Sequence, residues 1–174
     1  PEVNEADYKD YSSSFFAGLT GRDRIGNPTP NADYNQDGKV SYAEAHAFAK
    51  VNGETTDWPI STVEAWLQRQ ASDAEIQEIL ETPIEALGAI ARPEQQHVIT
   101  SLAPLIGFET SQSYTDNLRQ TPQPNANTVT EAYFKRLEME LINIDMERRL
   151  RERQSPEDIA ILEKLISCEA GQWR

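Results

Sequence analysis

The sequence predicts an all-α fold in which several short helices are followed by one long helix. Serine or threonine with an acidic residue three places later marks a helix N-terminus, and this pattern occurs at Ser61/Glu64, Ser72/Glu75, Thr82/Glu85, Thr128/Glu131 and Ser155/Asp158. No segment alternates apolar and polar residues as a half-buried strand does. Leu, Ile, Val and Phe together make up only 36 of the 174 residues, so the hydrophobic core must be small.

Two helices are expected in the N-terminal third of the chain. Apolar residues at helical spacing between Tyr8 and Leu19 predict an amphipathic helix that Gly21 ends. Residues 26–31 are rich in Gly, Pro and Asn and predict a loop. A second helix is expected from about Ser41 to Val51, before Asn52-Gly53.

The later helices have similar boundary signals. Pro83 and Pro156 are expected at the first helical position, where a missing N–H costs nothing. Arg92-Pro93 is expected to open a helix that bends at Pro104 and closes at Gly107. The uncharged residues 121–127 indicate a linker. These signals divide the chain into segments 1–60, 61–120, 121–128 and 129–174, which we expect to form one compact unit.

The long helix has two apolar faces instead of the single face of a surface helix. One face holds Tyr133, Phe134, Leu137, Leu141 and Ile144, and the other holds Met139, Ile142, Met146 and Leu150. Such a helix is either enclosed within the fold, which we favour, or covered on the second face by an upstream catalytic segment or another protein chain. The arginine-rich residues 148–153 are expected to interact favourably with the C-terminus of the helix, with an acidic partner as the alternative.

Charge excludes several functions. The net charge is −13, which disfavours binding to nucleic acid and to anionic membranes and favours cations as partners, although an acidic surface also serves solubility. The longest stretch without a charged residue has 14 residues and contains Pro104, so no membrane-spanning helix is expected. No secretion signal is visible, and the start at Pro1 suggests a trimmed chain.

No catalytic constellation is evident. Cys168 is the single cysteine, which rules out an internal disulfide, and no histidine lies near it in the sequence. His46 and His97 fall in helical patterns, and we expect both to have structural or surface roles. This chain therefore shows no nucleophile–base pair of its own.

Residues 33–44 fit every position of the twelve-residue calcium loop of EF-hand proteins. Calcium prefers six to eight oxygen ligands in a flexible shell. Asp33, Asn35 and Asp37 place side-chain oxygens at alternate positions, so a tightly curved chain points all three inward. Gly38 permits the sharp turn that a β-carbon would hinder.

The second half of the loop completes the predicted ligand set. The Lys39 carbonyl is expected to face the ion, Ser41 to act through a water molecule, and Glu44 to close the shell with two oxygens. Pro28 and Pro30 stand where an entering helix would run, and no second loop is present. Because calcium sensors use paired loops, we expect calcium to act here as a structural staple.

Part of the chain resembles a known family. Residues 11–21, 32–45 and 46–49 read YSSSFFAGLTG, ADYNQDGKVSYAEA and HAFA. This pattern resembles bacterial caspase-like and legumain-like cysteine peptidases, in which an aromatic helix and a calcium-type loop follow the catalytic core. The similarity covers about residues 7–51. The family's catalytic histidine and cysteine match no position here, so the resemblance implies a non-catalytic, C-terminal portion of a cysteine endopeptidase.

Two other functions are compatible with the sequence. The chain could be a calcium-dependent structural or interaction module unrelated to proteolysis, dockerin-like in a broad sense, or a cytoplasmic calcium sensor. A lone loop is expected to bind calcium in the range of extracellular modules, on the order of 10⁻⁴ to 10⁻³ M. This affinity favours a periplasmic or secreted location, with the cytoplasm as the alternative.

Overall fold

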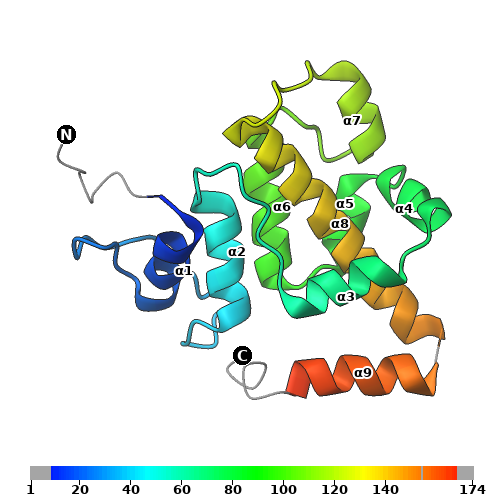
Figure 1. Ribbon diagram of the computed structural model, residues 1–174, viewed down its shortest axis with the longest axis horizontal. Coiled ribbons are helices and arrows are strands. Elements are labelled where there is room, and N and C mark those ends of the chain that lie inside the picture. The colour runs from blue at the N-terminus through cyan, green and yellow to red at the C-terminus, as the bar shows by residue number, and fades with distance from the viewer. Residues whose placement is uncertain (1–8, 154, 168–174) are drawn as a thin grey trace.

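The computed structural model describes residues 9–153 and 155–167, and these residues form nine helices. The helices are α1 (Tyr11–Thr20), α2 (Tyr42–Asn52), α3 (Thr62–Gln70), α4 (Asp73–Leu80), α5 (Ile84–Ile90), α6 (Pro93–Leu105), α7 (Tyr114–Gln120), α8 (Val129–Arg153) and α9 (Pro156–Ser167) (Figure 1). The described residues include two isolated β-bridges and no strand. The predicted all-α class is therefore confirmed.

Most helix starts follow the predicted capping pattern. Complete capping boxes form at Ser41, Ser61 and Ser72, where each serine accepts from the backbone N–H of the glutamate three places later. Thr128 and Ser155 also accept from the N–H three positions on. The first helix begins at Tyr11 with Asp10 as its cap. Tyr8, which the sequence placed in this helix, lies outside the described residues.

The predicted cap at Thr82 is wrong. Pro83 occupies the N-cap position of α5 without a side-chain cap, and the Thr82 hydroxyl donates to the Glu78 carbonyl instead. The backbone N–H groups of Ile84 and Glu85 donate to the carbonyls of Gln112 and Thr110 at 3.0 and 2.8 Å. These long-range backbone bonds satisfy the helix start, so a local cap is not needed.

Helix α7 was not anticipated from the sequence, although it carries the same type of signal. The Ser113 hydroxyl accepts from the Asp116 N–H at 3.0 Å and donates to the Asp116 carboxylate at 2.8 Å. The buried Asn117 side chain then bonds to the backbone of Glu109 and Ser113. This serine–aspartate pair was the signal that could have predicted the helix.

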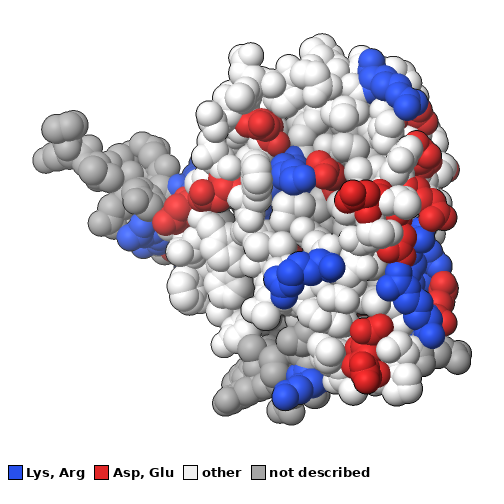
Figure 2. Space-filling view, turned by 45° about the vertical axis from the view of Figure 1, so that its right-hand side comes forward, with Lys and Arg blue, Asp and Glu red and all other residues white. Residues whose placement is uncertain are grey.

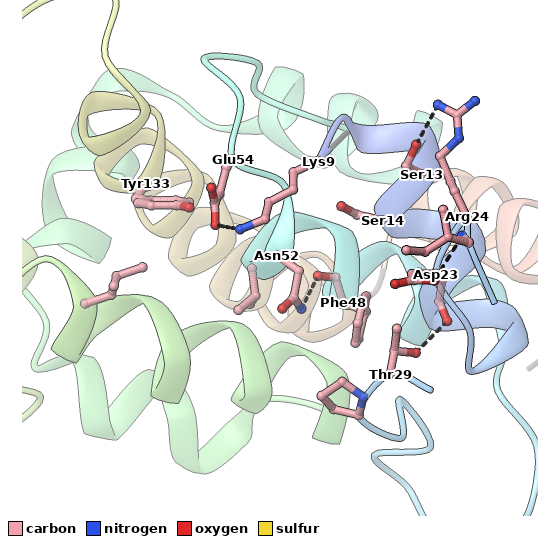
Figure 3. A pocket seen from close by; sticks show the side chains of 15 residues that line it. Lys9, Ser13, Ser14, Asp23, Arg24, Thr29, Phe48, Asn52, Glu54 and Tyr133 are labelled. Carbon is pink, nitrogen blue, oxygen red and sulfur yellow. Dashed lines mark hydrogen bonds and ion pairs between the residues drawn. The ribbon is translucent and has the colours of Figure 1, made fainter. Parts of the chain in front are cut away.

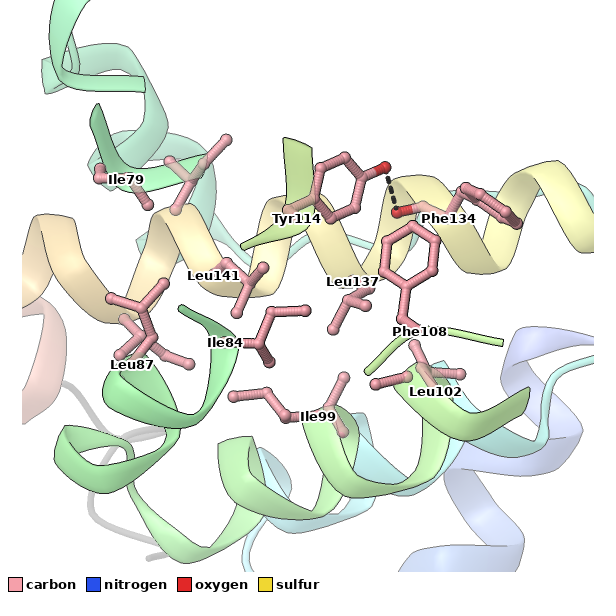
Figure 4. Packing of buried hydrophobic residues seen from close by; sticks show 14 of the residues in the cluster. Ile79, Ile84, Leu87, Ile99, Leu102, Phe108, Tyr114, Phe134, Leu137 and Leu141 are labelled. Carbon is pink, nitrogen blue, oxygen red and sulfur yellow. Dashed lines mark hydrogen bonds between the residues drawn. The ribbon is translucent and has the colours of Figure 1, made fainter. Parts of the chain in front are cut away.

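Helix α8 runs through the middle of the molecule and contacts α3, α4, α5, α6 and α9 (Figure 1). Ile84, Ile99, Leu102, Leu137 and Leu141 meet in the core between α5, α6 and α8 (Figure 4). The second apolar face is also covered within the chain, since Ile142, Met146 and Leu150 are buried. Met139 is half-buried. The enclosed arrangement of the long helix is the one observed.

The arginine-rich end of α8 forms ion pairs with acidic side chains. Arg149 pairs with Asp145 and with Glu78 of α4, at 2.6 and 3.1 Å, and Arg153 pairs with Glu75. On the face shown in Figure 2, basic side chains lie beside acidic ones. The cluster therefore joins α8 to α4.

Arg136 fastens α8 to the segment after α2. Its side chain is 3% exposed, and its guanidinium donates to the backbone carbonyls of Lys50, Gly53, Thr55 and Asp57 at 2.7–3.0 Å. The Tyr133 ring lies 5.3 Å from the guanidinium carbon. Planar guanidinium geometry suits this bridging of several carbonyls.

Helices α1 and α2 pack closely together beside the main core. Ala17, Ala32 and Phe48 form a small hydrophobic cluster between them, and Tyr34 contacts both this cluster and the main core. Within the described part of the chain, no helix is long and apolar enough to cross a membrane.

Candidate metal centre

The candidate calcium loop lies between the small α1–α2 cluster and the first turn of α2. Ala32, just before the loop, is buried, and Ser41 caps the helix that follows. Gly38 has φ of 85° and Gln36 has φ of 60°, both in the left-handed region. These two residues tighten the turn, and glycine adopts such a conformation without a steric penalty.

The side chains of the first half of the loop fold back onto the loop backbone. Asp33 accepts from the N–H groups of Asp37 and Gly38 at 3.1 and 3.0 Å. The Asn35 side-chain oxygen accepts from the Asp37 N–H at 2.9 Å, and Asp37 accepts from the Lys39 N–H at 2.9 Å. The Lys39 side chain is exposed, as expected for a residue that would offer only its carbonyl.

Glu44 closes the loop from inside. Its Oε1 accepts from the N–H groups of Tyr34 and Asn35 at 2.9 and 3.1 Å, and its Oε2 accepts from the N–H and hydroxyl of Ser41, both at 2.8 Å. The residue is 1% exposed. A carboxylate has about four acceptor positions, so these bonds use the capacity of Glu44 and join the two ends of the loop.

The donor set fits calcium in its chemistry, since all six predicted ligands offer oxygen. The structure does not arrange these side chains around an ion position. Among the described residues, no group of three or more His, Cys, Asp or Glu side chains is arranged to hold a metal ion. Asp33 and Glu44 bind backbone N–H groups instead. Calcium binding would therefore require these carboxylates to exchange N–H donors for the ion.

The loop is connected to the main core through an aromatic pair. The rings of Tyr34 and His97 of α6 stack with centroids 4.0 Å apart and an interplanar angle of 17°. Burial lowers the pKa of His97, and its Nε2 is buried without a hydrogen-bond partner. Burial therefore disfavours the charged form of the His97 imidazole, whose ring packs against Tyr34.

A buried polar network beside the loop was not foreseen from the sequence. Tyr11 of α1 bonds to His46 of α2, which bonds to Glu64 of α3; Lys50 of α2 then joins Glu64 to Glu140 of α8. Glu64 also accepts from the Ser61 N–H as the capping glutamate of α3. The only local signal was the Ser61/Glu64 pair, because the other partners are far apart in the sequence.

A cavity of about 400 Å³ opens between α1, residues 23–30, the end of α2 and the start of α8 (Figure 3). Its apolar lining includes Ala17, Phe48 and Val51. At the rim, Lys9 pairs with Glu54 and Arg24 bonds to Ser13 (Figure 3). Cys168, the single cysteine of the sequence, lies outside the described residues.

No family model, curated protein or solved structure matches this chain.

Proposed function

We propose that residues 33–44 bind a calcium ion that acts as a structural staple between the α1–α2 pair and the main core. The observation that carries the proposal is the position of Glu44, whose buried carboxylate already joins Tyr34 and Asn35 at the start of the loop to Ser41 at its end. An ion held by the same carboxylate would join the same two ends.

Six residues would hold the ion, with side-chain or backbone oxygens: Asp33, Asn35, Asp37, the Lys39 carbonyl, Ser41 through water, and Glu44. A bound calcium ion would supply positive charge that offsets the mutual repulsion of the three carboxylates. Because Asp33 and Glu44 must give up N–H donors, we expect weak binding, on the order of 10⁻⁴ to 10⁻³ M. Such an affinity supports a periplasmic or secreted location.

Titration calorimetry on wild type and on Glu44→Gln tests the proposal. Glutamine at this helix position can still complete the capping box, so the variant should fold while losing a charged ligand that offers two oxygens. We expect one site in the wild type and at least a tenfold weaker affinity in the variant. Glu85→Gln, at an exposed position, is the matched control and should bind as wild type does.

Unaltered affinity in Glu44→Gln, or no heat of binding in the wild type, would refute the assignment. A sub-micromolar dissociation constant would instead support a cytoplasmic protein.

The wider role that we propose is a non-catalytic, C-terminal portion of a caspase-like cysteine peptidase. Its support is the resemblance over residues 7–51, together with the absence of a catalytic histidine–cysteine pair in the sequence. The coding sequence upstream of Pro1 tests this role. A histidine–glycine pair after one apolar strand and a cysteine at the end of another would support it. Their absence would favour a calcium-dependent structural or interaction module unrelated to proteolysis.

A further inference from the structure

Four helices meet at a buried cluster of ionisable side chains. The Lys50 ammonium of α2 donates to Glu64 of α3 and, at 2.5 Å, to Glu140 of α8. Their side chains are 6%, 14% and 3% exposed, respectively. His46 Nε2 lies 2.9 Å from Glu64, and Tyr11 of α1 lies 2.7 Å from the other nitrogen of His46.

The two carboxylates of this cluster are in unequal surroundings. Glu64 has three partners, namely Lys50, His46 and the Ser61 N–H. Burial opposes its ionisation, but Lys50 and His46 hold the pKa of Glu64 well below its usual value. Glu140 has a bond only to Lys50 among those observed, and it is buried.

The charged groups that face Glu140 come from α2 and α3. Lys50 and His46 come from α2 and Glu64 from α3. The ion pairs that join α8 to its other neighbours lie further along the helix: Glu75 and Glu78 of α4 with Arg153 and Arg149, Arg92 with Glu147, and Glu163 of α9 with Arg151. The single ammonium of Lys50 therefore faces two buried carboxylates, and these three groups sum to a net charge of −1 when both carboxylates are ionised. One additional proton on a carboxylate would bring this sum to zero.

We propose that Glu140 holds that proton in the folded protein, so that the contact between Lys50 of α2 and Glu140 of α8 stabilises the fold less as pH rises. We call this pH-sensitive contact the latch. In the protonated state the carboxyl of Glu140 is neutral and still accepts from Lys50, while Lys50 and Glu64 form a balanced pair. Loss of the proton leaves a net negative charge inside the junction, where burial makes it costly.

The direction of the effect follows from linkage. Burial, partly offset by Lys50 and reinforced by Glu64, raises the pKa of Glu140 above its ordinary value of about 4.3. The folded state thus binds the proton more tightly than the unfolded state does. The stability from this group is complete below its unfolded pKa and is lost as pH rises through its folded pKa. Glu64 has the opposite effect on the pH dependence of stability. Because its pKa is lowered in the folded protein, its contribution is present at higher pH and is lost as pH falls.

Thermal unfolding of Glu140→Gln between pH 4.5 and 8.5 tests the latch. Glutamine imitates the protonated carboxyl, so the variant should melt within about 2 °C of wild type at pH 5 and above wild type at pH 8. Each tenfold difference in proton affinity between the folded and unfolded states corresponds to about 3–5 °C in Tm. Wild type and variant share His97, which is not among the charges that face Glu140, so its contribution cancels in the difference between their Tm profiles.

Glu64→Gln is the matched control. Because Glu64 is the ionised partner of Lys50, this variant should melt below wild type at neutral pH. If Glu140→Gln instead lowers Tm by the same amount at every pH, Glu140 is the ionised partner of a buried ion pair and the latch is refuted.

A measurement on unaltered protein gives a second test. Carbon-13 NMR of glutamate carboxyl groups, with the Glu140 signal assigned by its absence in Glu140→Gln, should show titration above the ordinary carboxyl range. Titration of that signal within or below this range would overturn the proposal. Neither experiment requires calcium, so failure of the latch and failure of the proposed calcium site are separate outcomes.

Discussion

At the scale of single residues, close approach between α1 and α2 depends on Gly18. A β-carbon built at Gly18 would lie 2.9 Å from both Cβ and Cγ of Phe48. Phe48 is 4% exposed and forms the small cluster with Ala17 and Ala32. The absence of a side chain at position 18 therefore lets α2 and the loop before it lie directly against α1.

We expect Gly18→Ala to destabilise the protein even though alanine is the better helix former. The clash with Phe48 should cost about 1–3 kcal/mol, which exceeds the gain of up to about 1 kcal/mol in helix propensity. Gly88→Ala is the matched control, because its β-carbon would meet only Ile99 at an ordinary 3.9 Å. That variant should be neutral or more stable. Urea unfolding of both variants measures the difference, and a stabilised Gly18→Ala would contradict the packing described here.

At the scale of elements, the connection between α2 and α3 has little apolar packing of its own and depends on Arg136. Residues 54, 56–58 and 60 are exposed. The four carbonyls that Arg136 binds lie at the end of α2 and in this connection. One buried side chain from α8 therefore shapes a segment about 80 residues earlier in the chain.

Arg136→Lys should destabilise the protein by about 2–3 kcal/mol, since an ammonium cannot reproduce the planar fork and leaves buried carbonyls without donors. Arg119→Lys, in an exposed pair with Asp116, is the control and should change stability by less than about 1 kcal/mol. Urea unfolding gives both values. Hydrogen exchange should also quicken at the end of α2 in Arg136→Lys alone, and unchanged protection there would argue against this role.

Some features of these helices and of the loop could be predicted from the sequence, and others could not. The caps at Ser61 and Ser72 were predictable because each bonds to a residue three places away. The start of α5 was not, because Ile84 donates to Gln112, which no local pattern reveals. In the loop, the order of the oxygen donors is visible in the sequence. The four bonds that occupy Glu44 and the stack of Tyr34 on His97 depend on the folded chain.

At the scale of the whole molecule, the loop lies where a local change can reach both hydrophobic clusters. Tyr34 contacts the small α1–α2 cluster and the main core, and its backbone N–H donates to Glu44. The network from Tyr11 to Glu140 joins α1, α2, α3 and α8 nearby. Ordering the loop should therefore stabilise both hydrophobic clusters against unfolding together.

We accordingly expect calcium to raise the melting temperature without altering the overall shape. At free calcium a hundredfold above the dissociation constant, linkage gives about 2.7 kcal/mol of stabilisation, or about 5–11 °C in Tm for a domain of this size. The helix content should stay constant, because α1 and α2 are already formed and packed. Thermal unfolding, circular dichroism and small-angle scattering with calcium or with chelator measure the three quantities.

Glu44→Gln separates a specific effect of the ion from general charge screening. The protein carries a net charge of −13, so any divalent cation at millimolar concentration reduces its self-repulsion. Screening of this kind should shift wild type and Glu44→Gln alike, and magnesium should reproduce it. A staple should give the larger shift only with calcium and only in wild type, because magnesium demands a more rigid octahedral shell than this loop offers. A large calcium-driven change in scattering with newly exposed apolar surface would instead identify a sensor.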